Sequence, residues 1–140
     1  MRTIDGLLLS LRQIGIKYTV KEIIRRILKK PYTYNGIVVE DSATFRAIRN
    51  LSSRGVVWAE GGLAYFRGRL GTFAAPKARM LWVFSEDLEG MYGVLDVRGR
   101  AVADVGAYLG ETAVLFAKWG AKYVYAYEPV FYKYAEYNSA

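Results

Sequence analysis

The sequence predicts an α/β protein, with a strand–helix–strand unit over residues 101–140 that follows a helical extension and a mixed α+β region. Two observations lead to this fold class. Residues 101–105 and 123–127 are short apolar runs typical of strands buried on both faces, and residues 111–119 between them have helical character. Apolar residues make up 53% of the 140 residues and charged residues 24%, which is the composition of a globular chain.

Residues 1–35 are expected to form a basic helical extension. Apolar residues recur at helical spacing over residues 7–14, and a second helix is predicted to open at Thr19, with Glu22 completing a capping box. The segment carries eight basic and two acidic residues, whereas residues 101–140 carry three and four. The second helix has apolar residues along one side: Val20, Ile23, Ile24, Ile27 and Leu28.

Two interpretations of this amphipathic helix differ in what its apolar side contacts. A basic helix of this kind can lie on an anionic membrane. Alternatively, its charged residues form a solvated outer face while its apolar side packs on the rest of the domain. We favour packing, because the segment has no Trp or Phe, the residues that usually anchor such helices at a membrane surface.

Residues 36–100 predict a mixed α+β region that contains a hairpin. A brief apolar strand at residues 36–39 is followed by a helix that Asp41 or Ser42 caps. The inner side of this helix repeats at helical spacing and consists of Phe45, Ile48 and Leu51.

The predicted hairpin pairs residues 56–58 with residues 63–66 across a Glu-Gly-Gly turn. Its aromatic residues, with Arg67 and Arg69 after them, could stack the bases of a single-stranded nucleic acid. The same residue types are ordinary in strands, so we favour a plain hairpin. The basic excess of the chain also lies in residues 1–35 rather than over the functional fold, and we therefore expect no nucleic-acid partner.

The sequence contains neither cysteine nor histidine. This composition excludes disulfides, catalytic thiols, imidazole bases and the usual zinc ligands, and no metal site is predicted. No apolar run approaches the roughly 18 residues of a membrane span or the ~7–15 residues of a signal-peptide core, so a cytoplasmic location is expected. Few Asn and Gln residues beside many Arg and Tyr residues are typical of thermophilic proteins.

The turn after residues 101–105 is the part of the sequence that predicts a ligand. It runs Gly106-Ala107-Tyr108-Leu109-Gly110 and leads into a helix, whose N-terminus offers unpaired N–H groups to an anion. Glu128 ends the adjacent strand and is expected to face the same crevice, where its carboxylate can accept hydrogen bonds from both hydroxyls of a ribose. The predicted ligand therefore has a ribose and a negatively charged group near the loop.

Two classes of cofactor fit this description, and a third interpretation has no ligand. A dinucleotide site requires a G-x-G-x-x-G loop, in which Tyr108 would occupy the second glycine position and crowd a pyrophosphate. The pattern Asp104-x-Gly106-x-x-x-Gly110 instead matches the first motif of S-adenosylmethionine-dependent methyltransferases, where the anionic group is a small carboxylate. In the third interpretation, the glycines serve only close packing within an αβ unit.

The run from Asp104 to Thr112, followed by Ala126-Tyr127-Glu128-Pro129, Tyr134 and Asn138, resembles the FkbM-type methyltransferases. The resemblance implies a Rossmann-like fold, S-adenosylmethionine as methyl donor, and an acceptor hydroxyl on a glycan, a sugar or another small molecule. It also implies a set of cofactor-binding residues. Asp104, Gly106, Ala107 and Gly110 match the family's cofactor loop, Glu128 matches its ribose-binding acid, and Tyr108 stands in the loop where many members have Asn.

The chain departs from this family in length. The strands that carry the adenine-contacting loop, the acceptor pocket and any general base in such enzymes lie beyond the second predicted strand and are absent from the sequence. We therefore expect residues 101–140 to be an incomplete Rossmann-like methyltransferase domain that is inactive alone, and we name no catalytic residue. The alternative is a non-catalytic protein in which residues 1–35 bind a membrane surface or a partner.

Overall fold

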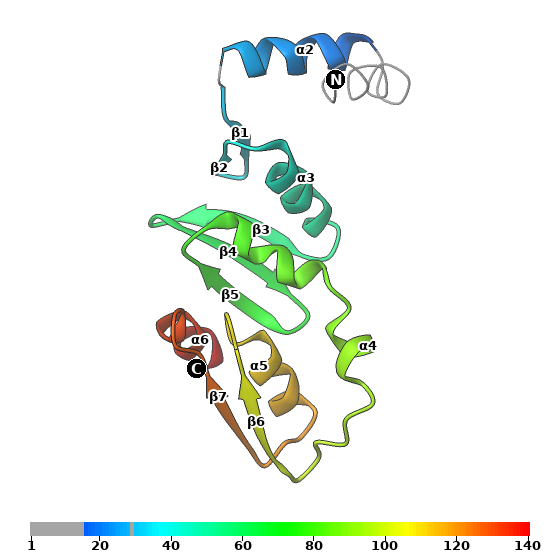
Figure 1. The fold of residues 1–140 in the computed structure, drawn as a ribbon, viewed down its shortest axis with the longest axis vertical. Coiled ribbons are helices and arrows are strands. Elements are labelled where there is room, and N and C mark those ends of the chain that lie inside the picture. The colour runs from blue at the N-terminus through cyan, green and yellow to red at the C-terminus, as the bar shows by residue number, and fades with distance from the viewer. Residues whose placement is uncertain (1–15, 29) are drawn as a thin grey trace.

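Three small sheets with helices against them form a mixed α/β structure (Figure 1). The computed structural model describes residues 16–28 and 30–140. The helix expected over residues 7–14 lies outside the described residues.

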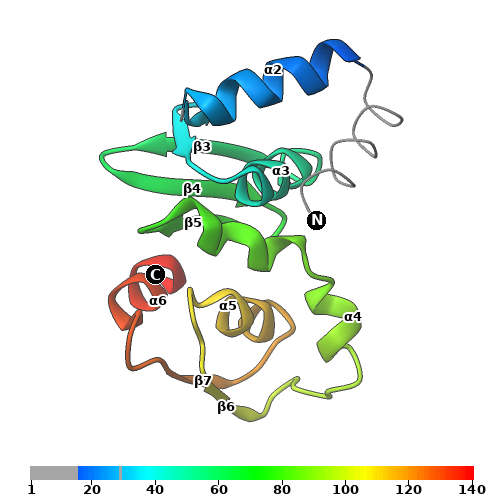
Figure 2. The same cartoon turned by 45° about the horizontal axis from the view of Figure 1, so that its top comes forward.

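Helix α2 (Ile16–Ile27) lies at one end of the molecule, beyond the first hairpin (Figures 1 and 2). Residues 16–18 are already helical, so the predicted start at Thr19 is wrong. Its apolar side is 47% to 73% exposed at four residues, namely Val20, Ile24, Ile27 and Leu28. At these four residues the expected packing of this side on the domain is therefore also wrong, whereas Ile23 on the same side is half-buried.

Strands β1 (Tyr32–Tyr34) and β2 (Ile37–Val39) pair as an antiparallel hairpin. Its turn is Asn35-Gly36, and both residues have positive φ angles, 46° and 80°, as a two-residue type I′ turn requires. A strand at residues 36–39 was predicted, one residue longer than β2, and β1 was not predicted, although an Asn-Gly pair between apolar residues is a strong hairpin signal.

Helix α3 (Ser42–Leu51) forms where the sequence predicts it. The Asp41 Oδ1 atom accepts a hydrogen bond from the Thr44 N–H at 2.7 Å, which caps the first turn. Ile48 and Leu51 are buried, and Phe45 is partly buried against the same core. The hydrogen bonds of Asp41 also hold the pKa of its carboxyl below its usual value.

The predicted hairpin is confirmed and is extended by a third strand. Strands β3 (Val56–Glu60), β4 (Leu63–Gly68) and β5 (Gly71–Ala75) form one antiparallel sheet in that order. A 3-10 helix, η1 (Ala78–Ser85), follows the sheet and packs on it together with α3. Its Phe84 ring lies 4.9 Å from the Phe66 ring and 4.6 Å from the Phe73 ring, between centroids.

Helix α4 (Leu88–Tyr92) leads from η1 to the last sheet, where β6 (Ala101–Val105), α5 (Glu111–Lys118) and β7 (Tyr123–Tyr127) follow one another. The strands are parallel, with Val105 opposite Tyr127. These three elements have the bounds that the sequence predicts, to within a residue.

The prediction that β6 and β7 are buried on both faces is wrong. Helix α5 packs against one face of this two-stranded sheet (Figure 2). On the other face Val105 is 82% exposed, and three tyrosines are more than half exposed: Tyr123, Tyr125 and Tyr127. A run of apolar strand residues therefore does not show that both faces of a sheet are covered. In the described part of the chain, a helix packs on only one face of this sheet.

Helix α6 (Tyr132–Ser139) joins this unit to the rest of the molecule. It packs beside β5 and α5, near the C-terminus of the chain (Figure 2). Leu109, which precedes α5, is fully buried in the same core cluster as Phe73 and Leu81. The loop before α5 is therefore built onto the hydrophobic core of residues 32–84.

Candidate functional site

The loop between β6 and α5 contains four of the six residues expected to bind a cofactor, namely Gly106, Ala107, Tyr108 and Gly110. Three of them have positive φ angles: 84° at Gly106, 48° at Tyr108 and 86° at Gly110. The two glycines have different surroundings. A Cβ atom added at Gly106 would meet nothing within 4 Å, whereas one added at Gly110 would lie 2.9 Å from the Ala135 carbonyl oxygen. Gly106 leaves open space above the loop, while Gly110 lets α6 pack closely.

The backbone N–H groups of this loop all donate within the chain. Those of Gly106 and Ala107 donate to the Tyr127 carbonyl oxygen at 2.8 and 3.3 Å, and that of Gly110 donates to the Ala107 oxygen at 2.6 Å. The Tyr108 N–H donates to Glu128 Oε2, at 3.0 Å. The Leu109 N–H donates to the side chain of Glu111, which is described below. A ligand carboxylate would therefore compete with acceptors already present.

Glu128 faces the loop, as the sequence predicts. Besides the Tyr108 N–H on Oε2, its Oε1 atom accepts hydrogen bonds from the N–H groups of Val130 at 2.7 Å and Phe131 at 3.0 Å. Desolvation alone would raise the pKa of this carboxyl, but the three N–H donors together hold the pKa below its usual value. A carboxylate has about four acceptor positions, so three are in use and one remains for a ligand hydroxyl.

Asp104 lies on the face of β6 that α5 covers. Its Oδ2 atom accepts a hydrogen bond from the Thr112 hydroxyl at 2.6 Å, and this bond joins the strand to the first turn of the helix. The structure thus joins Tyr108 to Glu128 directly, with Gly106 in the same loop, whereas Asp104 contacts the first turn of α5 behind the loop.

Glu111 lies inside the run from Asp104 to Thr112, and the sequence pattern assigns it no role. It is only 4% exposed, and its Oε2 atom accepts the Leu109 N–H at 3.1 Å. Burial raises the pKa of its carboxyl from 4.5 to about 7, and the nearby carboxylate of Asp104 adds to the rise. An acidic residue at the first position of an otherwise apolar helix was the signal that could have found it.

Asn138 is a second such residue. Its Nδ2 atom donates to the carbonyl oxygens of Ala74 at 3.0 Å and Leu109 at 2.9 Å, and its Oδ1 atom accepts the Ala74 N–H at 2.8 Å. One side chain on α6 therefore fixes both strand β5 and the loop before α5.

Metal and membrane features are absent from the part of the chain that the structure describes. It contains no group of three or more acidic side chains placed to hold a metal ion. None of its helices is both long enough and apolar enough to cross a bilayer.

No protein family, curated protein or solved structure matches the chain. The geometry of the loop and of the residues around it therefore carries the functional argument.

Proposed function

We propose that the chain carries the cofactor-binding end of an S-adenosylmethionine-dependent methyltransferase of the FkbM type, which acts on a hydroxyl of a sugar or another small molecule. One observation carries this proposal. Glu128 directly follows strand β7, and its carboxylate accepts the Tyr108 N–H of the loop after the parallel strand β6, a loop in which Gly106 has open space beside it. Ligands of parallel α/β sheets bind at this edge.

The residues of the loop fit such a cofactor in specific roles. The remaining acceptor position of Glu128 would take a ribose hydroxyl, and Gly106 would let the ligand approach the backbone. Asp104 would support the loop through Thr112 rather than by direct contact. When bound, S-adenosylmethionine supplies a methyl group whose transfer breaks a carbon–sulfur bond, forms a carbon–oxygen bond and releases the acceptor's hydroxyl proton to water.

The uncovered face of the β6–β7 sheet agrees with an incomplete methyltransferase domain of Rossmann-like fold. In such a sheet both faces are covered by helices. The exposed tyrosines of β7 would form the surface on which further elements pack. In this proposal the chain alone does not catalyse the reaction, and the enzyme acts in the cytoplasm.

Calorimetric titration of S-adenosylhomocysteine into the chain tests the proposal. We expect binding, and we expect Glu128→Gln to weaken it about tenfold or more, since a hydrogen bond to a charged group contributes roughly 1.5–3 kcal/mol. The matched control is Glu136→Gln, because Glu136 is an exposed acid on α6. No binding to the unaltered chain, or equal affinity in both variants, contradicts the proposal. Thermal unfolding of each variant separates lost binding from lost folding.

A second candidate function is favoured by one observation on helix α2. Its apolar side is exposed, and basic residues share the helix with it, among them Lys21 and Arg25. An exposed apolar face beside basic residues suits attachment to an anionic membrane surface. This role is compatible with the first proposal, because the β3–β4–β5 sheet lies between α2 and α6 (Figure 1).

A further inference from the structure

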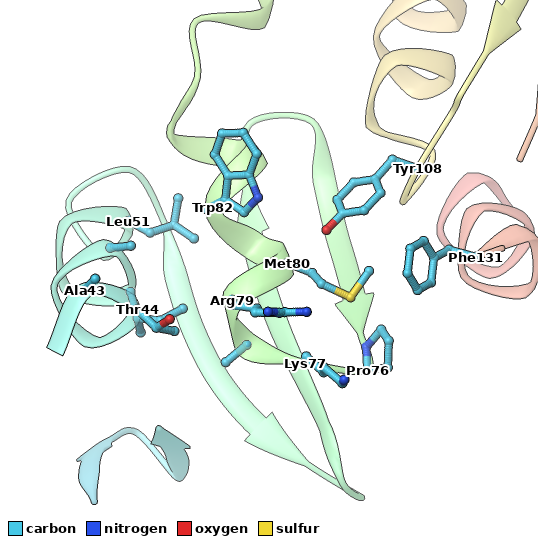
Figure 3. Close-up of a pocket in the computed structure, with 13 residues that line it drawn as sticks. Ala43, Thr44, Leu51, Pro76, Lys77, Arg79, Met80, Trp82, Tyr108 and Phe131 are labelled. Carbon is cyan, nitrogen blue, oxygen red and sulfur yellow. The ribbon is translucent and has the colours of Figure 1, made fainter. Parts of the chain in front are cut away.

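A pocket of about 590 Å³ lies between helix α3, helix η1 and the loop before α5 (Figure 3). Its volume is in the range of about 300–1,000 Å³ typical of sites for small molecules. The pocket is distinct from the open space above Gly106, which is not among its lining residues. It therefore provides room for a second small molecule beside the proposed cofactor site.

The inner wall of this pocket is apolar. Ile48 and Leu51 from α3 and Met80 from η1 line it, and all three are buried. The Trp82 side chain lines it as well and is half exposed. A ligand in this pocket would bury an apolar body against these side chains. This burial would make the largest favourable contribution to the free energy of binding there.

The outer part of the pocket is positively charged. Lys77 and Arg79 line it, both are exposed, and no acidic residue lines it with them. In the described part of the chain no ion pair joins either of these residues to a carboxylate. Two cations without a carboxylate partner beside an apolar wall form a complementary site for an anion with an apolar body.

Two residues connect this pocket to Glu128. The N–H groups of Tyr108 and Phe131 both donate to the Glu128 carboxylate, while their side chains line the pocket. The two rings pack edge to face with centroids 5.5 Å apart, and Figure 3 shows both extending toward Met80. The proposed ribose-binding residue and the pocket are thus held in a fixed relation by the same two residues.

The Tyr108 hydroxyl is a hydrogen-bond donor in this pocket. Burial raises the pKa of this phenol above its usual value, Glu111 adds to the rise, and the Arg79 charge opposes it. Tyr108 therefore keeps its proton at neutral pH and cannot act as a base there. With the Thr44 hydroxyl, it can orient an acceptor through hydrogen bonds.

We propose that this pocket takes an amphiphilic anion, with an apolar body against Met80 and Leu51 and a carboxylate or phosphate group at Lys77 and Arg79. It would be the part of the acceptor site that this chain supplies, in addition to the part expected beyond the second strand. The acceptor role rests on the proposed methyltransferase function, whereas binding of the anion does not. The site is formed by residues of the mixed α+β region together with the cofactor loop, so that region selects the acceptor.

Titration followed by NMR chemical shifts tests this site with cinnamate and its neutral counterpart cinnamamide. We expect cinnamate to bind about tenfold more tightly, as one charge-assisted hydrogen bond provides, with the largest shifts at Met80, Trp82 and Tyr108. Phenyl phosphate in a parallel titration shows whether the cations prefer phosphate to carboxylate. Binding of either anion supports the proposal, and binding of neither overturns it.

Two variants localise the effect. Arg79→Met removes one charge from the pocket and is expected to weaken cinnamate binding about tenfold while changing cinnamamide binding less than about twofold. Arg46→Met removes the same charge from an exposed residue of α3 that does not line the pocket, and it should change neither. Equal affinities for the two probes, or an equal loss in both variants, overturn the proposal.

The same samples separate this proposal from the proposed function. If S-adenosylhomocysteine binds and neither cinnamate nor phenyl phosphate does, the anion pocket is wrong and the cofactor site stands. If cinnamate binding depends on Arg79 and S-adenosylhomocysteine does not bind, the anion site stands and its acceptor role is wrong.

Discussion

Residues of the loop before α5 can serve close packing or ligand access, and the sequence pattern alone does not show which of these each residue serves. Gly106 and Gly110 are the first and last glycines of the motif, yet only Gly110 is needed for close packing against α6. Tyr108 adopts a positive φ of 48° without being glycine, and it directs its ring into a pocket while its N–H contacts Glu128. The close-packing interpretation of the glycines thus describes Gly110, and the ligand interpretation is compatible with Gly106.

Glu111 makes the stability of the chain depend on pH. Burial raises the pKa of its carboxyl to about 7 in the folded chain, whereas in the unfolded chain the value is near 4.5. The folded state therefore binds more protons between these values, and the free energy of unfolding falls as pH rises from about 4.5 to about 7. At roughly 1.4 kcal/mol per pKa unit, the expected loss is about 3 kcal/mol.

Urea unfolding at several pH values checks this prediction. Glu111→Gln keeps an acceptor for the Leu109 N–H and removes the charge, so its stability should not fall over that pH range. Glu136→Gln should retain the fall seen in the unaltered chain. Glu128 does not interfere, because its lowered pKa affects stability only below about 4.5. Parallel pH profiles for the unaltered chain and Glu111→Gln would contradict the argument.

The helices and strands differ in how well the sequence predicts them. The physical reason is that some are specified by neighbouring residues and others by contacts with distant parts of the chain. Helix α3, with the Asp41 cap, and the parallel strands β6 and β7 carry their signals within a few residues, so their positions were predicted. Strand β5 and helix η1 carry no such local pattern and form on the core that Phe66 provides. Burial of both faces of β6 was predicted wrongly, because it depends on whether elements distant in the sequence pack on each face of the sheet.

The sequence predicts the candidate site only where local patterns determine it. The orientation of Glu128 toward the loop followed from the strand order, but its three N–H partners depend on the turn at residues 129–131 and on Tyr108. The pocket could not be predicted at all, because Leu51, Arg79 and Phe131 come from segments far apart in the chain.

Helix α6 is the element whose attachment to the core depends most on one side chain. Asn138→Ala removes three hydrogen bonds, to Ala74 and Leu109, and leaves buried backbone groups without a partner. We expect a loss of roughly 1–3 kcal/mol in the free energy of unfolding, measured by urea denaturation, and faster hydrogen exchange at the Ala74 N–H. Tyr137→Ala, at an exposed neighbour, should cost within about 0.5 kcal/mol. Equal losses in both variants would show that Asn138 does not anchor the helix.

Charge and apolar exposure are distributed unevenly over the whole molecule. Residues 1–35 carry most of the positive excess, and α2 exposes its apolar side, whereas residues 101–140 are nearly neutral in total. A membrane surface would therefore be met by the N-terminal end, where α2 lies, while the cofactor loop lies apart from α2, against the core of residues 32–84 (Figure 1).

Co-sedimentation with vesicles tests this arrangement. We expect the chain to sediment with vesicles of phosphatidylserine and phosphatidylcholine at low salt and to be released at high salt, because screening weakens attraction between exposed charges. The double variant Ile24→Gln with Ile27→Gln removes apolar contact and keeps helix propensity. It should bind at least about tenfold more weakly, since burying one such side chain contributes roughly 1.5–3 kcal/mol. Val38→Gln, an exposed apolar residue of β2, is the control and should bind normally. Absence of sedimentation at low salt, or an equal loss in the control, means that α2 does not bind membranes and that its exposed face has another role.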